Sequence, residues 1–101
     1  MQIAQQEIFG PVMAVMAYDT LDEAIAIAND TPYGLHARIS GKDPAAMRAI
    51  VLQLQAGQIV FNAAPADLNA PFGGHKQSGN GREWGAYGFD EYLELKAMVS
   101  A

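Results

Sequence analysis

The 101-residue sequence predicts an α/β fold: a parallel βαβαβ unit followed by a glycine-rich loop, a helical segment and a terminal strand. Short strand-like runs alternate with two stretches of helical periodicity, an order that builds a parallel sheet with right-handed crossovers. Six of the ten glycines fall between residues 73 and 88, too densely for the interior of a helix or strand. We therefore expect a fixed loop there, with positive φ angles or close backbone approach.

The first strand and helix are predicted in the N-terminal third. Residues 12–17 form a continuous apolar run, whose short length favours a strand buried on both faces. Thr20 is the expected N-cap of the helix that follows, and Glu23 completes a capping box. Asn29 and the neighbouring Asp30 weaken this helix, and Thr31-Pro32 ends it.

The second strand, second helix and third strand follow directly. Residues 35–40 alternate apolar and polar side chains, as a strand with one face toward the core does. Asp43 is the expected N-cap of the second helix, with Pro44 at its first position and Gly57 at its end. Residues 58–62 are the third predicted strand.

The last third is less regular. Residues 63–81 form an irregular connection longer than ordinary loops, which indicates function or dependence on a neighbour. A helical stretch is predicted over residues 82–93, where the spacing of aromatic residues favours packing over ligand stacking. Residues 96–101 predict a short terminal strand. The loop departs from the Walker phosphate-binding pattern because Lys76 follows His75 and not a glycine.

Composition excludes several classes of protein. The net charge of −5 argues against binding to nucleic acid or to an anionic membrane surface. The absence of cysteine excludes a disulfide, a thiolate zinc site and a cysteine nucleophile. No signal peptide and no apolar run of about 20 residues is visible. We expect a cytoplasmic protein that forms one partial domain over residues 1–101.

The predicted sheet is incomplete. Half of the residues are apolar and only 17% are charged, so apolar surface is expected to remain for a partner to cover. Three parallel strands with two helices cannot cover both faces and both edges of a sheet. Either the rest of a larger domain or further copies of the chain must cover them.

Several separated motifs together resemble the C-terminal fifth of the NAD(P)-dependent aldehyde dehydrogenase family. The resemblance is collinear over nearly the whole chain, although no one motif decides it. The matching stretches are Glu7-Ile8-Phe9-Gly10-Pro11-Val12, residues 29–35, Gln55-Ala56-Gly57, Phe61-Asn62, residues 71–83, Tyr87-Gly88-Phe89 and residues 91–96.

The resemblance implies roles for particular residues. Glu7 would bind the ribose next to the nicotinamide of NAD(P), and Phe9 would contact the nicotinamide. Asn62 and Phe72 would line the aldehyde tunnel, although ordinary core packing is the equal alternative for Phe72. Lys76 and Arg82 would position the glycine-rich loop, and the terminal strand would pair subunits, as it does in relatives.

The family's thiol nucleophile, general-base glutamate and dinucleotide-binding domain all lie upstream of the matched region. We therefore expect a truncated segment that is inactive alone as a dehydrogenase, because thiohemiacetal chemistry needs a cysteine, and that does not bind NAD(P) tightly. Its expected partners are further copies, in a dimer or higher oligomer with or without strand swapping, or a companion aldehyde dehydrogenase polypeptide. The sequence does not distinguish NAD from NADP.

The alternative hypothesis is a repurposed oligomeric hydrolase of esters or phosphoesters. His36 and His75 are its candidate catalytic residues, since histidine is a common base and metal ligand near neutral pH. A divalent metal would be bound by these histidines with Asp19, Asp43 or Asp67. The spacing follows no ligand motif, and no serine lies in a nucleophile elbow.

Overall fold

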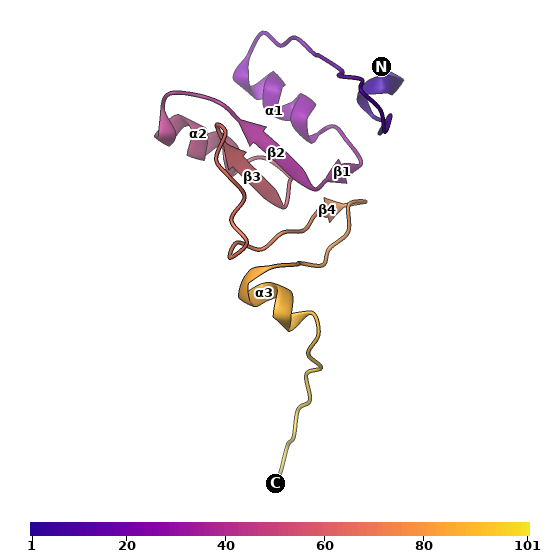
Figure 1. Ribbon diagram of the computed structural model, residues 1–101, viewed down its shortest axis with the longest axis vertical. Helices are drawn as coiled ribbons and strands as arrows, with labels where there is room; N and C mark the ends of the chain where they lie inside the picture. Colours follow the sequence, from indigo (N-terminus) through magenta and orange to yellow (C-terminus); the bar gives the residue numbers. More distant parts are fainter.

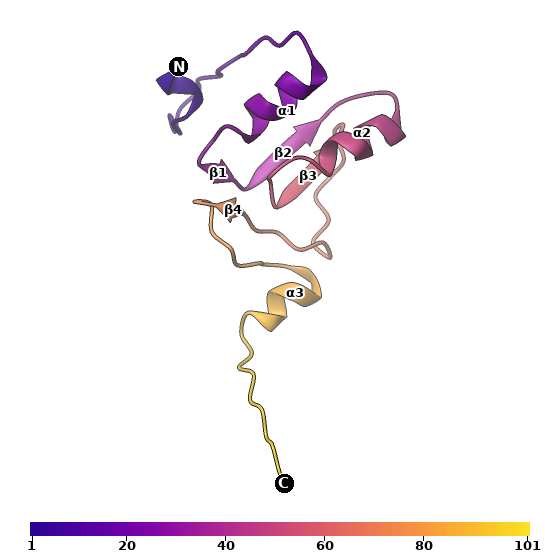
Figure 2. The same cartoon turned by 180° about the vertical axis from the view of Figure 1, so that it is seen from behind.

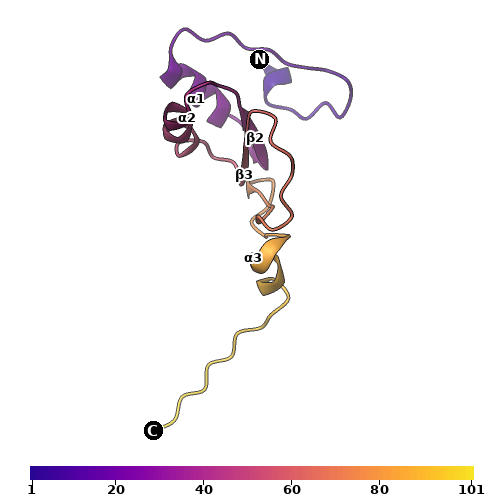
Figure 3. The ribbon, with the colours of Figure 1, turned by 60° about the vertical axis from the view of Figure 1, so that its left-hand side comes forward.

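The computed structural model describes residues 1–101 as an elongated α/β arrangement (Figure 1). Its long dimension comes from the C-terminal tail, which projects away from the body in every view (Figures 1–3). The elements are η1 (Gln2–Ala4), α1 (Leu21–Asn29), β1 (Tyr33–Gly34), β2 (His36–Ile39), α2 (Pro44–Val51), β3 (Gln58–Phe61), β4 (His75–Lys76) and α3 (Gly85–Asp90).

The body is built on the β2–α2–β3 crossover. β2 and β3 pair in parallel, with His36 opposite Gln58 and Ile39 opposite Phe61. Figure 3 shows α1 and α2 on the same side of these two strands. β1 continues the line of β2 and pairs antiparallel with β4, which connects the glycine-rich loop to the body. The predicted α/β class and the parallel crossover are confirmed.

Local capping explains where the two longer helices begin. At α1, Thr20 Oγ1 accepts the Glu23 N–H (3.2 Å), while Glu23 Oε2 accepts the Asp19 N–H (2.8 Å), one residue earlier than in a standard capping box. At α2, Asp43 Oδ1 accepts the N–H groups of Ala45 (2.9 Å) and Ala46 (3.2 Å). Both predicted N-caps are confirmed, but α2 ends at Val51, well before Gly57.

The structure corrects three predicted elements. Residues 12–17 and 96–101 are not strands, because neither segment pairs with another and a strand needs a hydrogen-bonded neighbour. Within residues 12–18 one backbone N–H has a backbone partner, from Val12 to the Gly10 oxygen. The predicted helix over 82–93 shortens to α3, because Glu83 bridges to Phe72 and Trp84 takes a positive φ of 65°.

Very little of this protein is buried. Met47 is the one buried apolar side chain, at 6% exposure. The accessible surface is 8299 Å², against about 5,500 Å² for a folded monomer of this mass. The radius of gyration is 17.2 Å, against about 13 Å for a compact domain of this length. The predicted surplus of apolar surface is therefore present. None of the helices is long and apolar enough to cross a membrane.

The glycine-rich loop packs backbone on backbone. A Cβ on Gly57 would overlap the carbonyl oxygen of Gly73, and a Cβ on Gly73 would overlap that of Gly81. Gly79 has a φ of +94°, in the region that favours glycine. The prediction that this loop needs close backbone approach and positive φ is confirmed. The connection after α2 and the glycine-rich loop thus pack together without side chains between them.

Gly57→Ala is expected to lower the free energy of unfolding by about 1–3 kcal/mol, because the added methyl group meets a carbonyl group that cannot move aside. Gly10→Ala is the matched control, since a Cβ there meets nothing within 4 Å, and its effect should stay within about 0.5 kcal/mol. Urea unfolding followed by circular dichroism measures both. Equal effects of the two variants would contradict the backbone packing described for Gly57.

Candidate functional site

Glu7 and Phe9 lie on the exposed segment between η1 and α1. They border a hollow of about 490 Å³, whose other lining residues include Ile3, Val12 and Met16. Phe9 is 92% exposed and has a φ of 55°, an uncommon backbone conformation for a bulky residue. Glu7 is exposed as well. The segment thus presents one carboxylate and one aromatic ring outward, close together in sequence.

Asn62 and Phe72 have partners inside the protein. Asn62, with a φ of 52°, follows β3, and its Oδ1 accepts the Gly41 N–H at 3.0 Å. Phe72 stacks on Trp84, with ring centroids 4.9 Å apart and planes inclined by 26°. The hollow beside Glu7 and Phe9 includes neither Asn62 nor Phe72. The predicted cofactor contacts and the predicted tunnel residues therefore do not line one common hollow in this protein.

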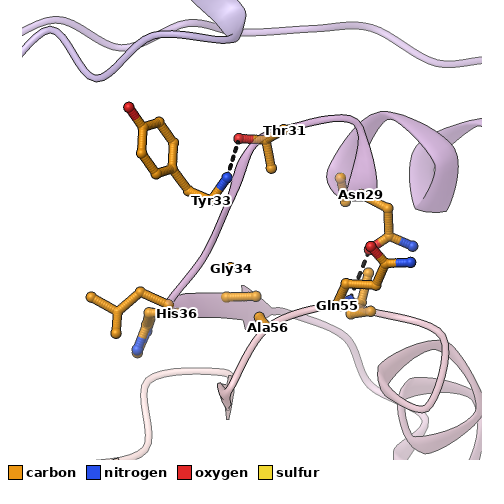
Figure 4. A pocket seen from close by; sticks show the side chains of 11 residues that line it. Asn29, Thr31, Tyr33, Gly34, His36, Gln55 and Ala56 are labelled. Carbon is orange, nitrogen blue, oxygen red and sulfur yellow. Dashed lines mark hydrogen bonds between the residues drawn. The ribbon is translucent and has the colours of Figure 1, made fainter. Parts of the chain in front are cut away.

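Asn29 and Lys76 form a polar clamp between three segments. Lys76 Nζ donates to the carbonyl oxygens of Asn29 (2.6 Å) and Thr31 (3.0 Å) at the C-terminal end of α1, where a cation is favoured by the helix dipole. The Asn29 side chain accepts the Gln55 N–H (2.8 Å; Figure 4), and it donates to the Gln53 oxygen (2.8 Å). We call this arrangement the Asn29–Lys76 clamp.

Sequence reasoning missed the role of Asn29, which it treated only as a weak helix residue. The available signal was an asparagine at the expected end of a helix, where a side-chain amide can bond to carbonyl and N–H groups that the helix leaves free. The partner segment, residues 53–55, is not identifiable without the fold. The clamp borders a hollow of about 340 Å³ (Figure 4), lined by residues from α1, β1, β2 and the connection before β3.

Arg82 holds the glycine-rich loop through its guanidinium group. Its Nη1 donates to the carbonyl oxygens of Gly74 (2.8 Å), Asn80 (3.1 Å) and Gly81 (2.9 Å). Its backbone N–H donates to Glu91 Oε1 at 3.1 Å, which ties the loop to the end of α3. Lys76 and Arg82 therefore both act as positioning residues for the loop, as predicted.

The predicted metal ligands are not assembled. His36 Nδ1 lies 3.1 Å from Gln58 Oε1, and His75 is exposed on β4. Asp43 Oδ1 caps α2, and Asp67 Oδ1 accepts hydrogen bonds from Asn69. No group of three or more histidine, cysteine, aspartate or glutamate side chains is arranged to hold a metal ion. The hydrolase hypothesis, with its divalent metal, has no support in the geometry of the protein.

Comparison with known proteins decides the family. The sequence model of the aldehyde dehydrogenase family matches residues 1–98. The chain belongs to the aldehyde dehydrogenase family. A putative aldehyde dehydrogenase of Staphylococcus epidermidis is 54% identical over 99 residues, which are 98% of this chain and 21% of that protein. A putative aldehyde dehydrogenase of Staphylococcus aureus is 53% identical over the same shares.

Solved aldehyde dehydrogenases have the same local fold. A mutant of aldehyde dehydrogenase C from Pseudomonas syringae, in complex with NAD+ and octanal, matches with a TM-score of 0.94 and 56% identity, over 98% of this chain and 20% of that one. Betaine aldehyde dehydrogenase from Staphylococcus aureus matches with a TM-score of 0.89 and 42% identity, over 95% of this chain and 19% of that one. The chain thus spans about a fifth of the length of the aldehyde dehydrogenases it matches.

Asn29→Ala is expected to cost about 1–3 kcal/mol of unfolding free energy, because it removes the hydrogen bonds to the Gln53 oxygen and from the Gln55 N–H, each worth about 0.5–1.5 kcal/mol. The rate of hydrogen exchange at the Gln55 amide should also rise in this variant. Asn69→Ala is the matched control, since that side chain bonds only within its own turn to Asp67. If exchange at Gln55 responds equally to both variants, the clamp does not hold this connection.

Proposed function

We propose that this chain is a segment of an aldehyde dehydrogenase that contributes binding surface to an assembly and performs no aldehyde oxidation by itself. The observation that carries the proposal is the exposed apolar surface of the protein. Its 101 residues include no cysteine, so the thiol needed for thiohemiacetal chemistry has to come from outside them. This segment supplies walls of the site, and other residues supply the chemistry.

The surplus surface is large enough to define an obligate interface. The accessible area of 8299 Å² exceeds that of a compact monomer by about 2,800 Å², and obligate interfaces bury about 2,000–5,000 Å² in total. Met13 and Val15 are 84% and 80% exposed on the unpaired segment before α1, and Leu95 is fully exposed on the tail. A companion aldehyde dehydrogenase polypeptide covers these side chains, or further copies of the protein do so when it is alone.

Glu7 and Phe9 are proposed as the cofactor contacts. A carboxylate suits the paired hydroxyl groups of the ribose next to the nicotinamide, because charge-assisted hydrogen bonds to it are strong. An exposed phenylalanine ring suits the flat face of a nicotinamide. The Pseudomonas syringae relative was solved with NAD+ and octanal, which supports an NAD(P) site in the assembly. Asn62 and Phe72 are proposed for the wall of the aldehyde tunnel.

Light scattering of the purified protein is expected to give a mass of at least two copies, because isolation would leave the apolar surface in water. Met13→Asp combined with Val15→Asp should shift the mass toward one copy or cause loss of folded protein. Gln2→Asp is the charge control on η1, and should leave the mass unchanged. A folded monomer at micromolar concentration would contradict the proposed interface.

Cofactor contact is tested by co-expression with an aldehyde dehydrogenase polypeptide from which the matching segment has been deleted. The 101-residue protein alone should bind NAD only at millimolar concentration or not at all, and should oxidise no aldehyde. In the restored assembly, Glu7→Gln should raise the KM for NAD by about tenfold to a hundredfold, since a hydrogen bond to a charged group is worth about 1.5–3 kcal/mol.

Gln2→Ala is the matched control for this assembly, because it changes an exposed residue of η1 that does not line the hollow beside Glu7 and Phe9. Its KM should equal that of the parent assembly. Aldehyde oxidation by the 101-residue protein alone, or an unchanged KM for NAD in Glu7→Gln, would overturn the corresponding part of the proposal.

A further inference from the structure

Asn80 and Gly81 form an exposed Asn-Gly pair in the glycine-rich loop. Both residues are exposed and lie outside helices and strands, between β4 and α3. Of the four asparagines, Asn80 alone precedes a glycine; the others precede Asp30, Ala63 and Ala70. Glycine has no Cβ to hinder its backbone nitrogen from approaching the preceding side chain. No hydrogen bond occupies the backbone N–H of Gly81.

Arg82 is placed to activate this same peptide group. Its Nη1 donates to the Asn80 carbonyl oxygen at 3.1 Å and to the Gly81 carbonyl oxygen at 2.9 Å. The Asn80 carbonyl and the Gly81 nitrogen belong to one peptide unit, so negative charge on that nitrogen spreads to the oxygen that Arg82 binds. A charge-assisted hydrogen bond from guanidinium therefore stabilises the deprotonated form of the amide.

We propose that Asn80 is a site of spontaneous deamidation and that Arg82 accelerates it. The Gly81 nitrogen gives its proton to a solvent base and attacks Asn80 Cγ; the new bond closes a five-membered succinimide as the Cγ–Nδ2 bond breaks and ammonia leaves. Water then opens the ring. Attack at Cγ gives aspartate, and attack at the former backbone carbonyl carbon gives isoaspartate.

The isoaspartate product changes the group that Arg82 holds. Its free carboxylate derives from the former backbone carbonyl of Asn80, and the backbone is lengthened by one carbon atom at this point. The oxygen beside Arg82 Nη1 thereby becomes part of a carboxylate, which a guanidinium binds more strongly than a neutral carbonyl group. The modification thus adds negative charge where the loop is tied to Glu91 through the Arg82 N–H.

The test is incubation of the purified protein at neutral pH and physiological temperature, followed by peptide mapping that separates aspartate from isoaspartate. Asn80 should convert before Asn29, Asn62 and Asn69. Gly81→Ala should slow the conversion strongly, and it is sterically mild because a Cβ there meets only the Glu91 carboxyl group at 4.0 Å. Conversion at Asn80 no faster than at the other three asparagines would overturn the site.

Arg82→Gln isolates the effect of the guanidinium. In the folded protein it should slow deamidation of Asn80 by about tenfold or more, as loss of one charge-assisted hydrogen bond predicts. In concentrated urea, where the loop is not held, the parent protein and the variant should react at equal rates. If Arg82→Gln reacts as fast as the parent or faster in the folded state, the accelerating role of Arg82 is wrong. Circular dichroism confirms that both proteins are folded at the start.

Discussion

The arrangement of this protein depends on apolar surface that it cannot bury by itself. One buried apolar side chain, Met47, is not a hydrophobic core. The 39 backbone–backbone hydrogen bonds compare with about 70 expected for a folded domain of this length. Both deficits are concentrated in the segment before α1 and the tail after α3. These segments lack both strand partners and cover for their apolar groups, and one neighbouring sheet would supply both.

Where a core is missing, cations and glycines hold the body together. Lys76 binds carbonyl oxygens at the C-terminal end of α1, and Arg82 binds carbonyl oxygens within the glycine-rich loop. Glycine makes this arrangement feasible, because at Gly57 and Gly73 any side chain would occupy the space of a neighbouring carbonyl group. The close approach brings several carbonyl oxygens within reach of one guanidinium group. The hydrogen bonds of Arg82 thus depend on the high glycine content of the loop.

The parts of the fold that the sequence predicted are those determined by local interactions. The caps at Thr20 and Asp43 act within one turn of their helices, and the parallel β2–β3 pair needs only the α2 crossover between its strands. The residue types at positions 12–17 are those of a strand, but a strand forms only beside a pairing partner, which composition does not specify. The start of α3 depends on the Phe72–Glu83 bridge, a contact that the glycine-rich loop brings about.

At the candidate site, some motif residues use their side chains for hydrogen bonds within the protein, and others remain exposed. The sequence motifs alone do not tell these two groups apart. Lys76 and Arg82 use their charged groups within the protein, whereas Glu7 and Phe9 remain exposed. The Asn62 side chain is only partly used within the protein, because its Oδ1 accepts the Gly41 N–H. Its Nδ2 group is left to donate, and an aldehyde oxygen is an acceptor. The Gly41 contact therefore orients the amide so that the proposed tunnel role of Asn62 is that of a hydrogen-bond donor.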